Sequence, residues 1–338
     1  MAKRATLADV AERSGMSRTA VSLALNQVPN SRLSSEAIER IHQAAAELDY
    51  RPNPAARSLR VGKTATIAFL SDNVTVTRYA SAMIRGLLDV AETEDHTVLI
   101  AETGDTPARI GKALKAMLDR RPDAVVFGLM GAKEIDVPKL PSDLPVVLLN
   151  STSPQGHACV LPDEFQGGRD IARTLAEAGH RRVAIIGHDD GLIQNLRLST
   201  TMRDRFAGIF SGLEEAGMEV ALRIEGPTWE PPFGYQGMAR VLELDEPVTA
   251  VIALNDRVAF GAYQALQERG FSVPNDISVV SFDDDDIASY LHPGLTTAAI
   301  PYEEMGRSAM TMALAGATFG QRELVPMPLR LRGSVKRV

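Results

Sequence analysis

The chain has 338 residues, 45% of them hydrophobic and 23% charged, which is enough for two or three domains with complete cores. Its single cysteine, Cys159, excludes an internal disulfide and fits a reducing compartment. The sequence shows no apolar run of the signal-peptide type and no stretch approaching about 18 consecutive apolar residues. We therefore expect a soluble, cytoplasmic protein that has no membrane partner.

Charge is distributed unevenly along this chain, whose net charge is −7. Residues 1–63 carry 10 Lys and Arg against 6 Asp and Glu, which gives this part a net charge of +4. The rest of the chain therefore carries −11. A small basic head on an acidic body is typical of proteins in which only the head contacts phosphate, so we expect double-stranded DNA as a partner of the head.

Residues 6–26, TLADVAERSGMSRTAVSLALN, predict two short helices joined by a tight corner. Thr6 and Asp9 form a capping-box pattern, so the first helix is expected to begin at Leu7. Gly15 lies at the corner, because glycine adopts a left-handed backbone at little cost. Ser17 is expected to cap the second helix. This pattern predicts a helix-turn-helix, whose second helix usually enters the DNA major groove.

A third helix is predicted from a Ser34 cap to about Leu48, and it completes an all-α DNA-binding domain over residues 1–52. Residues 53–62 predict a hinge helix, because Asn53 can cap it and Pro54 is tolerated at a first helical position. Helices shorter than about 12 residues are marginal alone in water. We therefore expect the hinge helix to form conditionally, when it pairs with its twin on DNA.

The body, residues 63–338, alternates apolar runs with helical stretches, and the pattern restarts near Val183. It predicts two α/β lobes, each a doubly wound parallel sheet, with a ligand cleft at the carboxyl ends of the strands. Strands are predicted at Ala65–Leu70, Thr97–Ala101, Ala124–Phe127, Val146–Leu149, Val183–Ile186, Ala221–Glu225, Ala250–Ala253 and Ile277–Phe282. Helices are predicted near residues 79–95, 107–120, 165–179, 203–217, 234–244 and 256–270.

The segments TLADVAERSGMSRTAVSLALN and YRPNPAARSLR resemble the lactose/galactose repressor family of bacterial transcription regulators, and the similarity extends along essentially the whole chain. The resemblance implies a periplasmic-binding-protein-like body that crosses between its lobes three times. Lobe 1 would hold about residues 64–161 and 296–320, and lobe 2 about 163–291 and 321–338. The resemblance also implies a homodimer on a palindromic operator, with Leu59 of the ARSL motif wedged between base pairs in the minor groove.

Base contacts are expected near the start of the second predicted helix, where Arg18 can bond to guanine and Thr19 can meet a thymine methyl group. Family members often carry arginine where this chain has Leu23, so the operator sequence stays open. The complete set of predicted DNA-binding residues is Thr6, Ser17, Arg18, Thr19, Ser22, Leu23, Asn26, Arg32, Asn53, Ala56, Arg57, Leu59 and Arg60.

Polar side chains that follow the predicted strands are the candidates for an effector site. Arg205 matches the family arginine that grips ligand oxygens, and Trp229 falls where relatives offer an aromatic platform to a sugar ring. The predicted effector residues are Asp72, Tyr79, Asp163, Arg205, Trp229, Asn255, Asp256, Asp283 and Tyr302. Carboxylate and amide oxygens beside an aromatic ring suit a carbohydrate, while sugar phosphates, nucleosides and purines stay open as effectors.

Two other classes of function fit parts of the sequence. A sugar- or nucleoside-binding protein without a transcriptional role would share the body but not the basic head. A sugar-processing enzyme would need a catalytic pairing such as a G-x-S-x-G elbow, which does not occur. No two histidines lie at i, i+4, so we expect no metal site, and no cofactor is predicted. The sequence therefore predicts a ligand-responsive repressor.

Overall fold

The computed structural model describes residues 5–26, 31–50, 58, 62–75, 78–104, 106–226 and 228–338. Most of the predicted hinge helix over residues 53–62, including Leu59, lies outside these described residues. Residues 1–65 and 66–338 form two separate compact units, the head and the body. Each unit is described by itself.

The head is a small bundle of α1 (Leu7–Ser14), α2 (Arg18–Leu25) and α3 (Ser35–Glu47). The predicted capping box is present: the Thr6 hydroxyl accepts from the Asp9 amide, and the Asp9 carboxylate accepts from the Thr6 amide at 2.7 Å. Gly15 ends α1 with φ of 67°, the left-handed conformation that the corner requires. The core that the three helices share consists of Val10, Ala11, Val21, Ala24, Ile41, Ala44 and Ala45.

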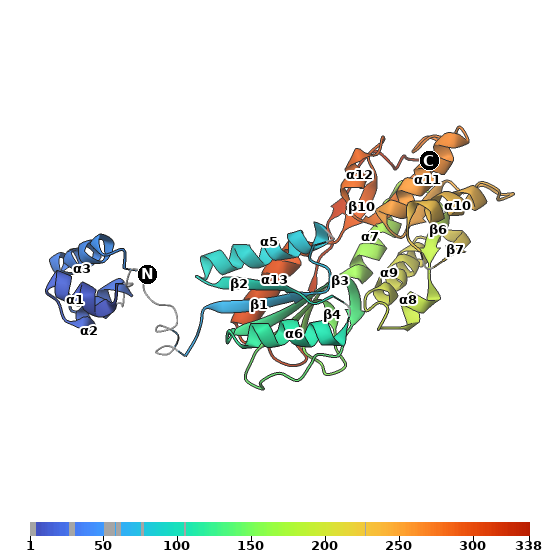
Figure 1. Ribbon diagram of the computed structural model, residues 1–338. Helices are drawn as coiled ribbons and strands as arrows, with labels where there is room; N and C mark the ends of the chain where they lie inside the picture. Colours follow the sequence, from blue (N-terminus) through green and yellow to red (C-terminus); the bar gives the residue numbers. More distant parts are fainter. Residues whose placement is uncertain are drawn as a thin grey trace. The chain divides into compact units, whose positions relative to one another are not determined.

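Lobe 1 of the body is built on a six-stranded sheet with the order β11-β5-β4-β3-β1-β2, in which every pair of neighbours is parallel. Figure 1 labels β1 to β4 of this sheet and the helices around it. Its strands are β1 (Thr66–Ser71), β2 (Thr97–Glu102), β3 (Ala124–Glu134), β4 (Val146–Thr152), β5 (Ala158–Pro162) and β11 (Arg322–Val325). Its helices are α5 (Arg78–Thr93), α6 (Pro107–Leu118) and α13 (Tyr302–Leu314).

Alternate residues of β1 show why lobe 1 is covered on both faces. Ile67 and Phe69 pack with residues of α5 and α13, whereas Ala68 and Leu70 pack with residues of α6 on the opposite face. Side chains along a strand point alternately to the two faces of a sheet, so a continuous apolar strand needs an apolar partner on each side.

Lobe 2 has a second six-stranded sheet with the order β12-β10-β9-β8-β6-β7, parallel except for the antiparallel edge pair of β12 and β10. Its strands are β6 (Arg182–His188), β7 (Glu219–Glu225), β8 (Ala250–Ala253), β9 (Ser278–Asp283), β10 (Thr296–Ala299) and β12 (Leu329–Arg330). Its helices are α7 (Glu164–Glu177), α8 (Asp190–Gln194), α9 (Met202–Glu215), α10 (Pro231–Val241), α11 (Asp256–Glu268) and α12 (Asp286–Tyr290).

Helices also cover both faces of the second sheet. One apolar cluster joins Val183 and Ile185 to residues of α7 and α9, and another joins Ala184 and Ile186 to residues of α10 and α11. Helices α7 and α9 approach so closely that a Cβ on Gly208 would collide with the carbonyl oxygen of Phe165. The predicted fold class, a helix-turn-helix head and a body of two doubly wound lobes, is confirmed.

The chain passes between the lobes three times, after β5, after β10 and after β11. The second crossover lies at Ile300–Pro301, later than the expected boundary at residue 296, because β10 pairs with β9 in lobe 2. The third lies after Val325 instead of residue 320, because β11 pairs with β5 in lobe 1. Both strands are four residues long, too short for their sequence pattern to assign them to a sheet.

Among the residues that the structure describes, no helix combines the length and the apolar character that a membrane span needs.

Candidate functional sites

The first candidate site is the N-terminal half of α2 in the head. The Ser17 hydroxyl accepts from the Ala20 amide at 3.1 Å and fixes the start of the helix. Arg18 and Thr19 follow it and are exposed, while Ser22 and Leu23 are half-buried one turn later. The arrangement presents a cationic donor and a hydroxyl at the same end of one helix, as direct contact with base edges requires.

The other predicted DNA-binding residues of the head surround α2 less tightly. Asn26 follows the helix, and its amide donates to the Ser22 carbonyl at 2.6 Å. Arg32 is exposed in the segment before α3, and Thr6 caps α1. The remaining predicted contacts lie outside the described residues: Asn53, Ala56, Arg57, Leu59 and Arg60.

The second candidate site is centred on Arg205 of α9 in lobe 2, of which only 1% is exposed. Its Nε and Nη2 donate to the two carboxylate oxygens of Glu164 at 2.6 and 2.8 Å, and its Nη1 donates to the Leu254 carbonyl at 2.8 Å. The guanidinium also lies over the Phe282 ring and 3.7 Å from a carboxylate oxygen of Asp283. Burial alone would lower the pKa of Arg205, but the carboxylates of Glu164 and Asp283 raise it on balance. The guanidinium therefore stays positively charged.

Asp256 lies near Asp283, at the start of α11, and is almost fully buried. One of its carboxylate oxygens accepts from the Ser281 hydroxyl, and the other accepts from the Asp285 amide at 2.6 Å. Burial, together with the negative charge of Asp283, raises the pKa of Asp256 to about 7. The hydrogen bonds from Ser281 and Asp285 oppose this rise. The carboxyl group therefore changes its charge near neutral pH.

Two tyrosines connect this region to lobe 1. The rings of Tyr79 on α5 and Tyr302 on α13 are 4.9 Å apart, and the Tyr79 hydroxyl donates to Asp285 of lobe 2 at 3.2 Å. Burial and the nearby Asp283 charge raise the pKa of Tyr302 well above its ordinary value, so its hydroxyl stays protonated. Tyr79, Asp283 and Tyr302 line one groove of about 540 Å³. The structure thus brings three predicted effector residues to one surface.

Trp229 and Asn255 form a separate pair at the carboxyl edge of the second sheet. Asn255 caps α11 through the Val258 amide at 2.8 Å, and its side-chain amide donates to the Trp229 carbonyl at 3.2 Å. The indole is half-buried, and its Nε1 is enclosed without a hydrogen-bond partner among the residues that the structure describes. A tryptophan with an apolar body and an unused donor is suited to contact a ligand.

Asp72 and Asp163, two other predicted effector residues, form hydrogen bonds with residues close to them instead of with Arg205. The Asp72 carboxylate accepts from the Met130 amide at 3.1 Å and from Lys133 at 3.4 Å, all within lobe 1. Asp163 caps α7 by accepting from the Gln166 amide at 3.1 Å. No described contact joins either residue to the Arg205 group.

Comparison with known proteins agrees with both parts of the chain. Residues 6–53 match the family described as bacterial regulatory proteins, lacI family, and residues 172–335 match the periplasmic binding protein-like domain. The ribose operon repressor of Haemophilus influenzae is 30% identical over 321 residues, which cover 92% of this chain and 91% of the relative. The repressor PurR of Erwinia tasmaniensis is 31% identical over 327 residues, which cover 94% of this chain and 92% of that relative. The chain belongs to the LacI family.

Membership of the LacI family makes the chain a DNA-binding transcriptional regulator and not an enzyme, as the sequence predicted. A solved structure of the Lac repressor dimer bound to operator and an anti-inducer superimposes with a TM-score of 0.74. The superposition covers 99% of this chain and all of that one, at 23% identity. This similarity shows that the head and the two lobes share the fold of that repressor.

Sequence reasoning missed two features of this LacI-family body. The first is Glu164, the buried partner of Arg205. Its only signal was a second acid directly after the capping Asp163. The second is residues 195–200, which leave lobe 2 and lie against β3 of lobe 1. We call this segment the strap.

The strap is held to lobe 1 by side-chain and backbone contacts. Arg197 donates to both carboxylate oxygens of Asp136 at 2.8 and 3.0 Å and lies 3.4 Å from Glu134. The Glu134 amide donates to the Leu196 carbonyl, and the Thr200 amide donates to the Ala132 carbonyl, both at 2.8 Å. The hydrogen bonds from Arg197 hold the pKa of Asp136 below its ordinary value. The strap therefore bridges the two lobes independently of the three crossovers.

Proposed function

We propose that this protein is a repressor that binds a palindromic operator as a homodimer, and that a neutral carbohydrate held by the body controls its affinity for DNA. In this proposal residues 1–52 read the operator, residues 53–62 form the hinge, and residues 63–338 bind the effector and the second subunit. The protein would act in the cytoplasm.

The acid excess around Arg205 is the observation that carries the choice of effector. A ligand phosphate would have to approach a guanidinium that Glu164 already neutralises, with Asp283 3.7 Å away. Carboxylates instead accept hydrogen bonds from hydroxyl groups, and the half-buried Trp229 ring suits the apolar face of a sugar. The name of the Haemophilus influenzae relative refers to a ribose operon, which supports the same ligand class.

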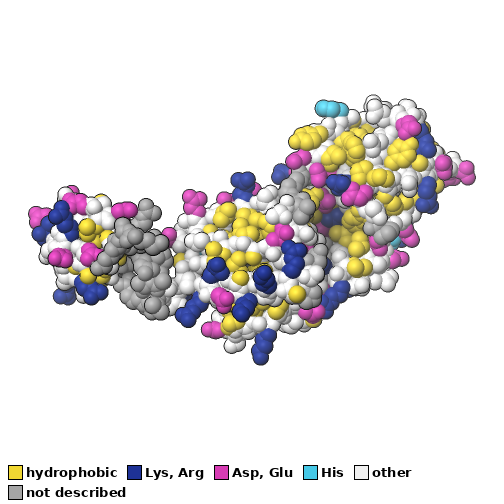
Figure 2. All heavy atoms as spheres, viewed as in Figure 1, with side chains coloured by type: hydrophobic (Ala, Val, Ile, Leu, Met, Phe, Trp, Pro, Cys, Tyr) yellow, Lys and Arg dark blue, Asp and Glu magenta, His cyan; other side chains and the backbone are white. Residues whose placement is uncertain are grey.

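Exposed apolar side chains on the body support the dimer. Leu88 of α5, Tyr290 of α12 and Leu331 after β12 are 45%, 71% and 69% exposed, respectively. Figure 2 shows hydrophobic side chains at the surface of both lobes on the face that it displays. A dimer interface would remove such apolar side chains from water. The related Lac repressor was solved as a dimer on its operator.

A selection of operator sequences from a random duplex library with the full-length protein would test DNA recognition. We expect a palindrome to be enriched. The variant Arg18→Ala should relax base preference at one position of each half-site by about 1–3 kcal/mol. Arg40→Ala is the matched control, because Arg40 is an exposed arginine of the same head on α3. An equal loss of affinity on all sequences for Arg18→Ala would make Arg18 a phosphate contact instead.

Thermal unfolding of the same protein with a panel of neutral sugars, sugar phosphates, nucleosides and purines would test the effector class. A neutral sugar should raise the unfolding temperature of the wild type and change operator affinity, since a ligand stabilises the state that it binds. Asp283→Asn should lose this response, whereas Asp245→Asn, at an exposed acid after α10 that does not line the groove, should keep it. Preferential stabilisation by a phosphorylated ligand would refute the carbohydrate proposal.

A further inference from the structure

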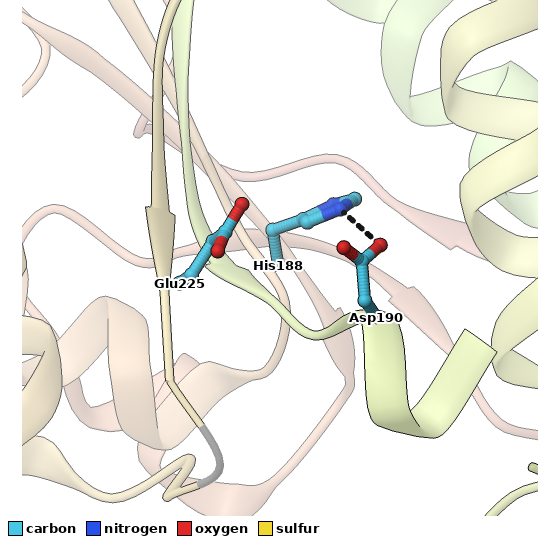
Figure 3. A group of neighbouring side chains, drawn as sticks. All are labelled: His188, Asp190 and Glu225. Atoms are coloured by element: carbon cyan, nitrogen blue, oxygen red, sulfur yellow. Dashed lines mark hydrogen bonds and ion pairs between the residues drawn. The ribbon is translucent and has the colours of Figure 1, made fainter. Parts of the chain in front are cut away.

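Three side chains from different elements of lobe 2 meet at the carboxyl edge of its sheet. His188 ends β6, Glu225 ends β7, and Asp190 begins α8. The parallel register places His188 and Glu225 opposite each other on neighbouring strands. Figure 3 shows His188 between the two acids. One ligand atom from each residue lies within 4.8 Å of the other two.

The two buried histidines of lobe 2 differ in how many of their ring nitrogens have a partner. His180 has both ring nitrogens occupied, by Thr249 Oγ1 at 2.7 Å and Ser278 Oγ at 3.0 Å. The His188 side chain is 7% exposed, and its Nε2 lies 3.2 Å from Asp190. Its Nδ1 is enclosed without a partner among the described residues. A histidine held only by packing usually satisfies both nitrogens, as His180 does.

The packing of the His188 ring leaves little freedom to its donor atoms. The His188 ring packs edge-on against the Phe206 ring with centroids 4.7 Å apart, and the centre of the Phe210 ring is 6.2 Å from it. Arg223, the cation on β7 nearest to Glu225 in sequence, stacks on Phe210 with its guanidinium carbon 4.4 Å from the ring centre. Within the part of the chain that the structure describes, neither Asp190 nor Glu225 is paired with lysine or arginine.

The distances suit a single metal ion. A zinc ion lies about 2.0–2.2 Å from nitrogen and oxygen ligands, so neighbouring ligand atoms are about 3.0–3.4 Å apart. The distance between His188 Nε2 and a carboxylate oxygen of Asp190, 3.2 Å, is within this range, so Nε2 is the ligand atom of His188. Glu225 is exposed, so its side chain can rotate to close the remaining gap. A divalent ion would also balance the charge of these two carboxylates, neither of which has a lysine or arginine partner among the described residues.

We propose that His188, Asp190 and Glu225 bind a divalent ion of the zinc, nickel and cobalt class. Imidazole favours these ions, whereas magnesium and calcium take oxygen ligands almost exclusively. Three protein ligands leave coordination positions for water or for a ligand oxygen. The ion ties the ends of β6 and β7 to the start of α8, and α8 ends at Gln194, directly before the strap. Binding of the ion therefore restrains the segment that bridges the lobes.

Calorimetric titration of tag-free, chelator-treated full-length protein with zinc would test this proposal. We expect one ion per chain for the wild type, and affinity at least about tenfold weaker for Asp190→Asn and for Glu225→Gln. Both acids are exposed, so these variants should fold. Glu219→Gln is the matched control, because Glu219 is an exposed acid at the other end of β7. Its affinity should equal that of the wild type.

Cobalt provides a second readout of the same site. Its visible absorption should intensify on binding to the wild type and to Glu219→Gln, and zinc should reverse the change, whereas excess magnesium should not. Absence of stoichiometric binding to the wild type would overturn the proposal. Equal affinity in the Asp190→Asn and Glu225→Gln variants would overturn it as well, because the ion would then lie elsewhere.

Discussion

Arg205 of lobe 2 and Arg197 of the strap pair with carboxylates at similar distances, but their roles in the structure differ. Arg205 is buried, and its partners Glu164 and Asp283 belong to its own lobe. Arg197 is half-exposed, and its partners Asp136 and Glu134 belong to the other lobe. The buried pair lies in the interior of lobe 2, whereas the exposed pair joins the two lobes. We therefore expect the buried Arg205–Glu164 pair to be required for folding and the exposed Arg197–Asp136 pair to be dispensable for it.

The environment of the two arginines explains this difference. Charges attract each other more strongly in a low-dielectric interior, but they lose their hydration there. Removing one partner leaves the other buried and unpaired, which is costly. At the surface, water and salt screen both partners. Substitutions at the two arginines should therefore have unequal effects on stability.

Arg205→Ala should have the largest effect. It leaves the Glu164 carboxylate, of which 2% is exposed, without its partner. We expect the free energy of unfolding to fall by about 3–5 kcal/mol, measured by urea denaturation followed by circular dichroism. A double variant that replaces both Arg205 and Glu164 with apolar residues should recover much of this loss. If Arg205→Ala loses almost nothing, the site admits water and the two arginines are alike.

Asp256 should make the buried region sensitive to pH. The pKa of Asp256 is raised from 3.8 to about 7, so the folded protein holds this proton more tightly than the unfolded chain. The contribution of Asp256 to stability is therefore fully present below pH 3.8 and is lost as the pH rises towards 7, by at most roughly 4 kcal/mol.

Measuring the free energy of unfolding against pH would check this prediction. Asp256→Asn should lose this part of the pH dependence, whatever its effect on absolute stability. Asp286→Asn, a substitution of an exposed acid, should keep the wild-type dependence. Identical pH profiles for the wild type and Asp256→Asn would show that Asp256 is ionised in the folded protein across this range, and that burial does not govern the region.

The sequence was informative wherever one element determined the outcome. The Thr6–Asp9 capping box and the Ala250–Ala253 strand were predicted correctly, because local pattern decides both. Arg205 and Asp283 were both proposed for the effector site, and they lie 3.7 Å apart. Each was identified by its place after a strand or in a family motif, and neither required knowledge of the other.

Features that depend on two distant segments could not be predicted in this way. Glu164 pairs with Arg205 only because α7 packs closely on α9, and the sequence does not show that contact. His188 and Glu225 are 37 positions apart, and only the register of β6 and β7 brings them together. A search for two histidines at helical spacing does not detect such a cluster. The strap has no periodic pattern, so nothing in residues 195–200 predicted that they cross to lobe 1.

Arg197→Ala should have the smallest effect on stability and the clearest effect on motion. The ion pair with Asp136 is exposed, so we expect no measurable change in the free energy of unfolding. Loss of the side-chain contacts should instead let the strap leave β3 more often. The Glu134 and Thr200 amides, which donate across the two lobes, should then exchange with deuterium faster than in the wild type.

Arg203→Ala provides the control, because Arg203 is an exposed arginine of α9 that donates to the Ile193 carbonyl within lobe 2. It should leave the exchange of both amides unchanged. High salt should reproduce part of the Arg197→Ala effect in the wild type, since it screens exposed pairs. Unchanged exchange of Glu134 and Thr200 in Arg197→Ala would mean that the backbone contacts alone hold the strap. The exposed arginine would then be dispensable to both fold and motion, and the contrast with Arg205 would rest on stability alone.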